Sequence, residues 1–279
     1  MERRRGRAAV RRRQLTVITH HLITRRADDD GVDAVVVERD YVLAHVVAQL
    51  PWVQMPAGGR LVFKGGSALR FVHIGQYRYS ADLDFTVLDS SPEDAATALS
   101  RAVAAAQAHA GFPTLEIRAG KSGLPRLAYV GPLGAAKIRT IKLDLAVDEH
   151  VETVARGRML DGVWRDLPAS AAFDVYTLPE ITAEKLRCVI QRVQCRDLYD
   201  LYRLTEDGNV DLRELAALFD SKARAKRIDP AVFPTRFEGR RKKYEERWER
   251  EMREHLKDPP RFDDVLRVVR RNLRQAGLI

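Results

Sequence analysis

The chain has 279 residues, 45% of them hydrophobic, and a formal net charge of +9. This composition can bury a substantial core, which excludes global disorder, and the two cysteines are too few for a disulfide framework. No apolar run is long enough to span a bilayer, and the basic N-terminus lacks the apolar segment of a secretory signal, so we expect a cytoplasmic protein with no membrane partner. The positive charge favours nucleic acid as a partner, although an Arg-rich composition would give the same charge without one.

The first part of the sequence has apolar residues at helical spacing. Residues 8–24 and 35–50 each predict a helix, and Pro51 ends the second one. The arginines between positions 3 and 13 would either contact phosphates or form a solvated helix face. We assign residues 1–55 to a helical segment packed on the core.

The middle of the chain alternates strands and helices. Residues 60–63 predict a strand that runs into Gly65 and Gly66, residues 67–74 predict a short helix, and residues 83–88 predict a second strand. A well-marked helix follows, because the sequence supplies a capping serine, a proline at the first helical position and a terminal glycine. These are Ser91, Pro92 and Gly111.

Three strand-like segments come next, at residues 114–120, 126–132 and 137–149, with turn residues between them. This order of elements predicts an α+β fold, with a sheet that ends near Val154 inside a core domain of residues 56–160. The rest of the chain, residues 161–279, predicts a helical domain. Its helical segments are residues 179–193, 196–207, 210–227, 236–255 and 262–277.

Two carboxylates occur on one face of a predicted strand. Asp82 and Asp84 are two residues apart, so both side chains project from the same side, and the alternation in IKLDLAV places Asp144 on one face of another strand. Neighbouring carboxylates repel each other unless a cation lies between them, and their hard oxygens suit Mg²⁺, with Mn²⁺ as an alternative. Three such acids predict a site for two metal ions. Alternatively, the acids would only pair with Arg70 or Arg78.

Glycines precede this strand and open a predicted helix. Backbone N–H groups of Gly65, Gly66 and Ser67 would bind a triphosphate, together with the serine hydroxyl, although an ordinary tight turn has the same pattern. On a later helix, Lys185 and Arg192 share one face, where a lysine can contact triphosphate oxygens or simply be solvated.

Acids and arginines then follow in CRDLYDLYRL. Arg196 continues the cationic stripe of the preceding helix. Asp197 is either a helix N-cap or a substrate-positioning residue, and we interpret Asp200 as structural, paired with Arg196 or Arg203.

Four motifs in order resemble a known family. They are KGGSAL followed by R-x-S-x-D-L-D-F, then KIRTIKLDL, ITAEKLRCVIQR and CRDLYDLYRL. Together they resemble the AbiEii/MenT nucleotidyltransferase toxins of the DNA polymerase β-like superfamily, over residues 64–204. The spacing between Ser67 and Asp82 is longer than in most members, and we expect a longer helix or loop to absorb it.

The resemblance implies a polymerase β-like nucleotidyltransferase sheet domain with flanking helices, followed by a C-terminal helical domain. It also implies which residues act, with Asp82, Asp84 and Asp144 as the metal ligands. Catalysis falls to Asp82, Asp84, Asp144, Lys185 and Asp197, and nucleotide binding to Lys64, Gly65, Gly66, Ser67, Lys185, Arg192 and Arg196.

The implied reaction transfers a nucleoside monophosphate from a nucleoside triphosphate to RNA, at the 3′ end of tRNA, and so blocks translation. A cognate antitoxin protein is the implied partner. There are two alternatives to this function. The same site would modify a small molecule or a protein if it were a closed acidic pocket, and a decayed site would leave a catalytically silent nucleic-acid-binding protein.

Overall fold

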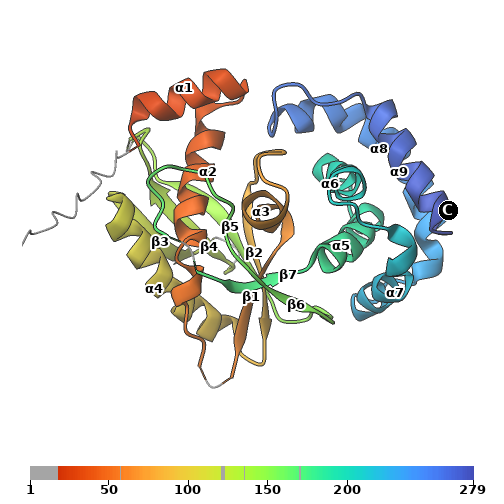
Figure 1. The fold of residues 1–279 in the computed structure, drawn as a ribbon, viewed down its shortest axis with the longest axis horizontal. Coiled ribbons are helices and arrows are strands. Elements are labelled where there is room, and N and C mark those ends of the chain that lie inside the picture. The colour runs from red at the N-terminus through yellow and green to blue at the C-terminus, as the bar shows by residue number, and fades with distance from the viewer. Residues whose placement is uncertain (1–17, 57, 121–122, 135, 170) are drawn as a thin grey trace, which may run out of the picture.

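The computed structural model describes residues 18–56, 58–120, 123–134, 136–169 and 171–279. In these residues the chain forms a seven-stranded mixed sheet with helices around it, followed by a group of helices (Figure 1). The strands are β1 (Arg60–Lys64), β2 (Asp82–Leu88), β3 (Thr114–Ala119), β4 (Pro125–Val130), β5 (Arg139–Ala146), β6 (Val154–Gly157) and β7 (Phe173–Tyr176). The longer helices are α1 (His20–Asp30), α2 (Ala34–Val47), α4 (Pro92–Ala110), α5 (Leu178–Gln191), α6 (Cys195–Glu206), α7 (Ala216–Ala225), α8 (Phe233–Arg253) and α9 (Phe262–Gln275).

The strand order places the predicted acids at the centre of the sheet. The order is β3-β4-β5-β2-β1-β7-β6, in which β2 is parallel to β5 and antiparallel to β1. Asp84 therefore has Asp144 as its partner on one side and Lys64 on the other. One carboxylate on a central strand is thus flanked by a second carboxylate and a cation.

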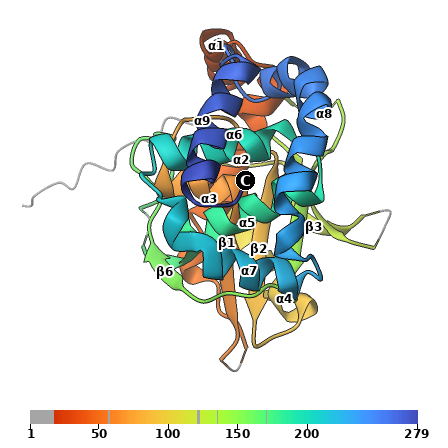
Figure 2. The ribbon, with the colours of Figure 1, turned by 90° about the vertical axis from the view of Figure 1, so that its right-hand side faces the viewer.

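The helices lie in two groups on either side of the short helix α3 (Gly65–Ala68) (Figure 1). In one group, α4 packs against β3 and β5, and α2 packs against α4. In the other, α5 contacts β7 and packs against α6, α7 and α8 (Figure 2). One apolar core runs through both groups and includes Leu83 and Phe85, which alternate with the acids along β2. The structure thus confirms the predicted α+β fold of a sheet with flanking helices and a helical C-terminal region.

The helix α4 forms for the reasons that the sequence indicates. The Ser91 hydroxyl accepts a hydrogen bond from the backbone N–H of Asp94, Pro92 is the first helical residue, and Gly111 ends the helix in the left-handed region at φ 68°. The predicted strands around it and the helical segments of the C-terminal region are present as well, with ends that differ by a few residues.

Two predicted boundaries are wrong. The first described helix, α1, begins at His20 and ends at Asp30 because Gly31 adopts φ 59°, whereas the prediction ended it at position 24. Residues 8–17 of that prediction, and the arginines between positions 3 and 13, lie outside the described residues. The sheet also continues past Val154 and past residue 160, because β6 and β7 extend it and β7 pairs with β1. Four-residue strands offer too few alternating positions to be predicted from their pattern.

Candidate active site

A cavity of about 730 Å³ lies between the central strands and the helices α5 and α6. Its lining includes eight Lys and Arg side chains and six Asp and Glu side chains, so it is highly charged and contains more cations than anions. Of the predicted site residues, the cavity brings together all but two. Those that line it are Lys64, Gly65, Gly66, Asp82, Asp84, Asp144, Lys185, Arg192 and Arg196.

Few cations neutralise the acids on the strands. Asp82 accepts a hydrogen bond from Arg196 at 2.8 Å, and Asp144 forms an ion pair with Lys142 at 2.8 Å, with its side chain 44% exposed. Burial raises the pKa of Asp84 to about 6, and the negative charges of Asp82 and Asp144 act in the same direction. This part of the cavity therefore favours an added cation.

The predicted alternative partners of these acids are occupied elsewhere. Arg70 pairs with Asp40, and Arg78 pairs with Asp200, so neither contacts the carboxylates of β2. Within the described part of the chain, no three His, Cys, Asp or Glu side chains form a group that could hold a metal ion as they stand. Instead, Arg196 and Lys142 neutralise two of the acids.

These acids nevertheless fit a hard divalent cation. All three line one cavity and their ligand atoms are carboxylate oxygens. Burial and then the negative charges of Asp82 and Asp144 raise the pKa of Asp84, and a bound cation would offset both effects. Among the described residues, two ion pairs, those of Asp82 and Asp144, would have to open before these oxygens become available.

The glycine turn packs directly on the acidic strand. Gly65 has φ +73°, which disfavours any side chain, and a Cβ there would collide with the Asp84 carboxylate. A Cβ on Gly66 would collide with the guanidinium of Arg78. Gly65 is therefore favoured by both its backbone conformation and the lack of space, and Gly66 by the lack of space alone. The helix begins at Gly65, two residues earlier than predicted, and continues as a π-helical turn over Leu69–His73.

Ser67 does not face the cavity. Its side chain is buried, donates a hydrogen bond to the backbone carbonyl of Asp82, and is hydrogen-bonded at 2.9 Å to the Ser80 hydroxyl. The predicted contact between this hydroxyl and a phosphate is therefore not available, since the hydroxyl points into the packing between the turn and β2. The π-helical turn and the loop after it absorb the long spacing and bring Ser67 beside Asp82.

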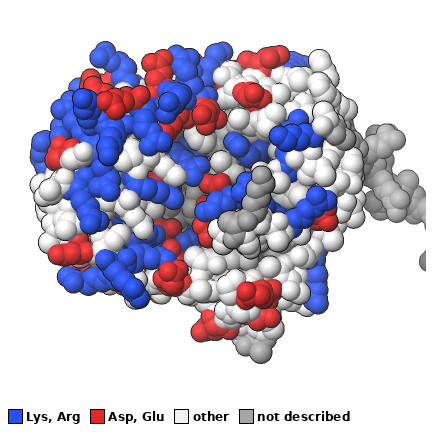
Figure 3. Space-filling model, turned by 180° about the vertical axis from the view of Figure 1, so that it is seen from behind, with Lys and Arg blue, Asp and Glu red and all other residues white. Residues whose placement is uncertain are grey.

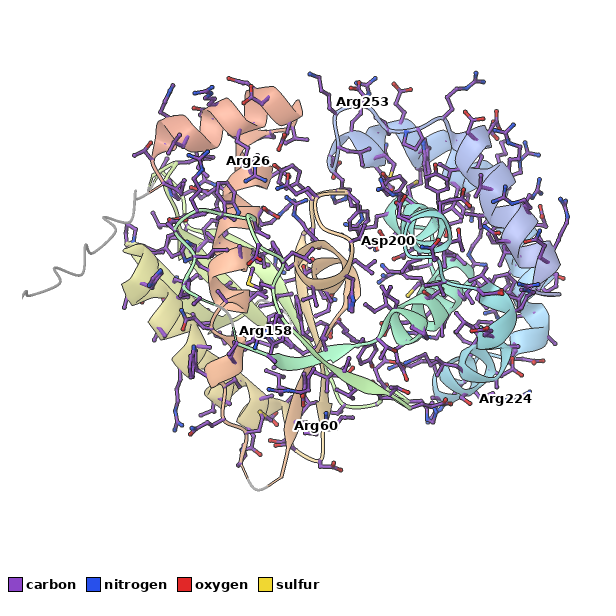
Figure 4. The ribbon with its side chains drawn as sticks, in the orientation of Figure 1. Arg26, Arg60, Arg158, Asp200, Arg224 and Arg253 are labelled. Atoms are coloured by element: carbon purple, nitrogen blue, oxygen red, sulfur yellow. The ribbon has the colours of Figure 1, made fainter. Side chains whose placement is uncertain are left out.

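A second set of acids lies on α6 and is fully paired with cations. Lys185 contacts Asp197 at 2.8 Å and Asp200 at 2.7 Å, and Arg192 contacts Asp197 at 2.9 Å. Arg78 donates two hydrogen bonds of 2.7 Å to Asp200. Figure 4 shows Asp200 on the side of α6 that faces α3. The prediction that Asp200 pairs with Arg196 or Arg203 is wrong, because the fold brings Arg78 and Lys185 to it instead.

The pKa shifts of the α6 acids are opposite in sign to that of Asp84. Burial alone would raise the pKa of Asp197, but Lys185 and Arg192 lower it to about 2. In the same way, Arg78 and Lys185 outweigh burial and hold the pKa of Asp200 far below its usual range. Asp197 lies in the first turn of α6, and Gln194 is the N-cap residue, so the N-cap interpretation of Asp197 is wrong.

The cavity also contains charged residues that the sequence analysis did not assign to the site. Buried Lys64 lies between Glu184 at 3.1 Å and Glu149 at 3.3 Å. Arg187 and Lys226 also line the cavity. Glu184 and Arg187 lie near Lys185 in the segment ITAEKLRCVIQR, and this position is what could have indicated them from the sequence. Glu149 and Lys226 carry no motif.

A central strand pair thus presents clustered acids beside a glycine turn, and cations from the following helical region line the same cavity. The family described as nucleotidyl transferase AbiEii toxin, type IV toxin–antitoxin system, matches residues 52–268, and the chain therefore belongs to this family of nucleotidyltransferase toxins. No curated protein matches the sequence.

Solved structures with a similar fold include the nucleotidyltransferase toxin MenT4 from Mycobacterium tuberculosis. Its TM-score is 0.55 at 22% identity, and the match covers 76% of this chain and 74% of that one. An antigenic nucleotidyltransferase-like protein from Paracoccidioides brasiliensis matches with a TM-score of 0.37 at 14% identity, covering 71% of this chain and 97% of that one. The first match supports the same fold. None of the helices among the described residues is both long and apolar enough to cross a membrane.

Proposed function

We propose that this toxin transfers a nucleoside monophosphate from a nucleoside triphosphate to RNA, at the 3′ end of tRNA, and thereby blocks translation. The observation that carries the proposal is the cavity, in which under-neutralised acids of β2 and β5 face a larger number of cations. Such an arrangement suits a polyanionic substrate that arrives with divalent metal ions. The reaction would occur in the cytoplasm, where both substrates are present.

The metal ligands would be Asp82, Asp84 and Asp144. Two Mg²⁺ ions, or Mn²⁺ in their place, would stabilise the attacking and leaving oxygens of an in-line displacement at the α-phosphorus. Before this, Arg196 must release Asp82 and Lys142 must release Asp144. Asp144, the most exposed of the three, would also be able to accept the proton of the acceptor hydroxyl.

The triphosphate would lie against the glycine turn and the cations of the helices. Gly65, Gly66 and Arg192 line the cavity, and the Arg192 side chain is 44% exposed. The backbone N–H groups of the two glycines and the Arg192 guanidinium would contact phosphate oxygens. Lys185 and Lys64 are buried in ion pairs and would act mainly through their positive charge. Asp197 would position Lys185 and Arg192, because it contacts both.

RNA is favoured as the acceptor by the distribution of charge. Seen from behind, Lys and Arg side chains cover much of the C-terminal half, on the left of the view (Figure 3). Arg224 points outward from α7 (Figure 4), whereas Lys222 on the same helix is buried against Glu180 and unavailable to RNA. Cations also outnumber acids in the cavity, which argues against a closed acidic pocket for a cationic small molecule. RNA binding should therefore weaken steeply with salt. The family also implies an antitoxin partner.

The test is to incubate the protein with total tRNA, Mg²⁺ and each labelled nucleoside triphosphate in turn. Label should appear in the tRNA band, and it should disappear with EDTA or with Asp82→Ala. Asp28→Ala, which removes an exposed acid from α1, is the matched control and should transfer normally. Label on a protein or small molecule alone would contradict RNA as the acceptor. No transfer with any triphosphate, by protein shown to be folded, would contradict the reaction itself.

A further inference from the structure

One face of the helix α8 carries only cations. Its residues recur at intervals of three and four, so they form a single stripe along the helix, which we call the α8 stripe. The stripe consists of Arg236, Arg240, Lys243, Arg247 and Arg250. From its first to its last residue the helix rises by about 21 Å. Arg236, Lys243 and Arg250 are exposed, so the stripe presents positive charge to the solvent.

The acids of α8 neutralise cations outside the stripe. Glu238 pairs with Arg270 of α9, and Glu249 pairs with Arg253 of α8 itself. Among the residues that the structure describes, four of the five stripe cations form no ion pair with an acid, and only Arg247 does, with Glu251. The stripe thus keeps a net positive charge that the fold does not balance.

The stripe is fixed beside the C-terminal end of α5. Arg240 donates a hydrogen bond to the backbone carbonyl of Gln191 at 3.4 Å, and Arg247 donates one to that of Val193 at 3.0 Å. Buried Tyr244, which lies between these two arginines on α8, has its hydroxyl 3.1 Å from the carbonyl of Arg192. The last carbonyls of a helix lack intrahelical donors, and cations complement the negative end of its dipole, so these contacts stabilise the packing. They hold the stripe in one position relative to the connection between α5 and α6.

This connection is part of the cavity wall. Gln191, Arg192 and Gln194 all line the cavity. A single hydrogen bond, from Arg240 to the carbonyl of Gln191, therefore joins the stripe to a residue of the wall. The Arg192 side chain is 44% exposed, so cations continue from the stripe to the cavity. Figure 2 places α8 on the right of the view, which is the side of the molecule that Figure 3 shows.

A stripe of this kind fits the backbone of a nucleic acid. Lys and Arg side chains bind successive phosphates and release their counterions, and such contacts fix the position of the nucleic acid without reading its sequence. An acidic protein segment would also match the charge. The continuity between the stripe and the cavity favours the acceptor instead, because a chain whose 3′ end reacts in the cavity must pass the cavity wall.

We propose that the α8 stripe binds the sugar–phosphate backbone of the acceptor RNA and directs its 3′ end past Arg192 into the cavity. This inference rests on the proposed function, because it takes RNA as the acceptor. The stripe residues are then substrate-binding residues that contact phosphates of the RNA and neither the metal ions nor the triphosphate. Their loss should weaken RNA binding at any sequence.

Two double variants of the same helix separate the stripe from net charge. Arg236→Gln with Lys243→Gln removes two exposed cations of the stripe. Arg241→Gln with Lys242→Gln removes an exposed arginine and an exposed lysine from other faces of α8, and is the matched control. Both variants lose two positive charges and change only exposed side chains, so their melting temperatures should equal that of the wild type.

The measurement is the anisotropy of a labelled tRNA titrated with each protein. The stripe variant should bind it with a Kd about tenfold or more above that of the wild type, and the control variant should stay within about twofold. The slope of log Kd against log salt should fall by about two in the stripe variant alone. The Kd for a non-hydrolysable triphosphate, measured without RNA, should be the same in all three proteins.

Three results would overturn the proposal. The first is equal RNA affinity in the two double variants. The second is weaker triphosphate binding by the stripe variant. The third is a stripe variant that loses affinity for a poly-glutamate peptide and not for RNA, which would assign the stripe to an acidic protein.

The two proposals fail in distinguishable ways, because RNA binding is measured without turnover. A wild-type protein that binds RNA through the stripe but transfers no nucleotide would contradict the proposed reaction and leave the role of the stripe intact. Transfer to tRNA with the same KM for tRNA in both double variants would contradict the role of the stripe alone.

Discussion

Two sets of aspartates, one on the strands that line the cavity and one buried on α6, differ in their electrostatic environment. On the strands, burial and the charges of Asp82 and Asp144 raise the pKa of Asp84 to about 6. On α6, Asp197 contacts two cations and its pKa is lowered to about 2. The strand acids are therefore costly to the fold and available to a ligand, whereas the helix acids are part of the ion-pair network that holds the two halves of the site together.

The largest effect on activity is expected from neutralising Asp84. Asp84→Asn should reduce nucleotide transfer by about a thousandfold or more, because a metal ligand contributes several kcal/mol to transition-state stabilisation. Its melting temperature should stay equal to or exceed that of the wild type, since one of three neighbouring negative charges is removed. Transfer rates and thermal unfolding measured on the same preparation test this prediction. A variant that is unstable and still active would show that Asp84 has a structural role and is not a metal ligand.

Neutralising an acid on α6 should have the opposite outcome. Asp200→Asn leaves Arg78 buried without its carboxylate and should lower the free energy of unfolding by about 3–5 kcal/mol. Transfer by the molecules that remain folded should fall far less than with Asp84→Asn. Urea unfolding provides the measurement, and an unchanged midpoint would mean that the network contributes nothing to the fold.

A pair of glycine substitutions separates backbone strain from displacement of the acid. Gly65→Ala and Gly111→Ala both place alanine at positive φ, which costs about 1 kcal/mol or more in either case. Only Gly65→Ala also drives a methyl group into the Asp84 carboxylate, since a Cβ at Gly111 meets no atom within 4 Å. Transfer should therefore be lost in Gly65→Ala and retained in Gly111→Ala, and equal activities would show that the turn does not position Asp84.

The smallest expected effect comes from Ser67. Ser67→Ala removes the hydrogen bonds to the Asp82 carbonyl and Ser80, which should cost about 1–2 kcal/mol of stability and up to about tenfold in kcat. The KM for the triphosphate should not rise, because the hydroxyl is turned away from the cavity. A large increase in KM with unchanged stability would instead indicate a direct phosphate contact.

Much of this site could be predicted because it depends on local patterns. The spacing of Asp82 and Asp84, the alternation around Asp144 and the glycines after β1 each reflect the geometry of one element. The register that sets Asp84 opposite Asp144 confirms their proximity, while their roles stay predictions.

The features that could not be predicted depend on contacts between distant segments. The partner of Asp200 is Arg78, 122 residues earlier, and no sequence spacing indicates such a pair. The direction of the Ser67 side chain follows from how the turn packs on β2. Tertiary packing decides both features.

The most direct test of the central claim is the binding of a divalent ion to the strand acids. Mn²⁺ can be titrated into the protein with a non-hydrolysable triphosphate, and the free ion followed by electron paramagnetic resonance. The account predicts that the wild type and the folded fraction of Asp200→Asn bind Mn²⁺ with similar affinity, and that Asp84→Asn binds it at least about tenfold more weakly. Equal binding by the wild type and Asp84→Asn would contradict the account.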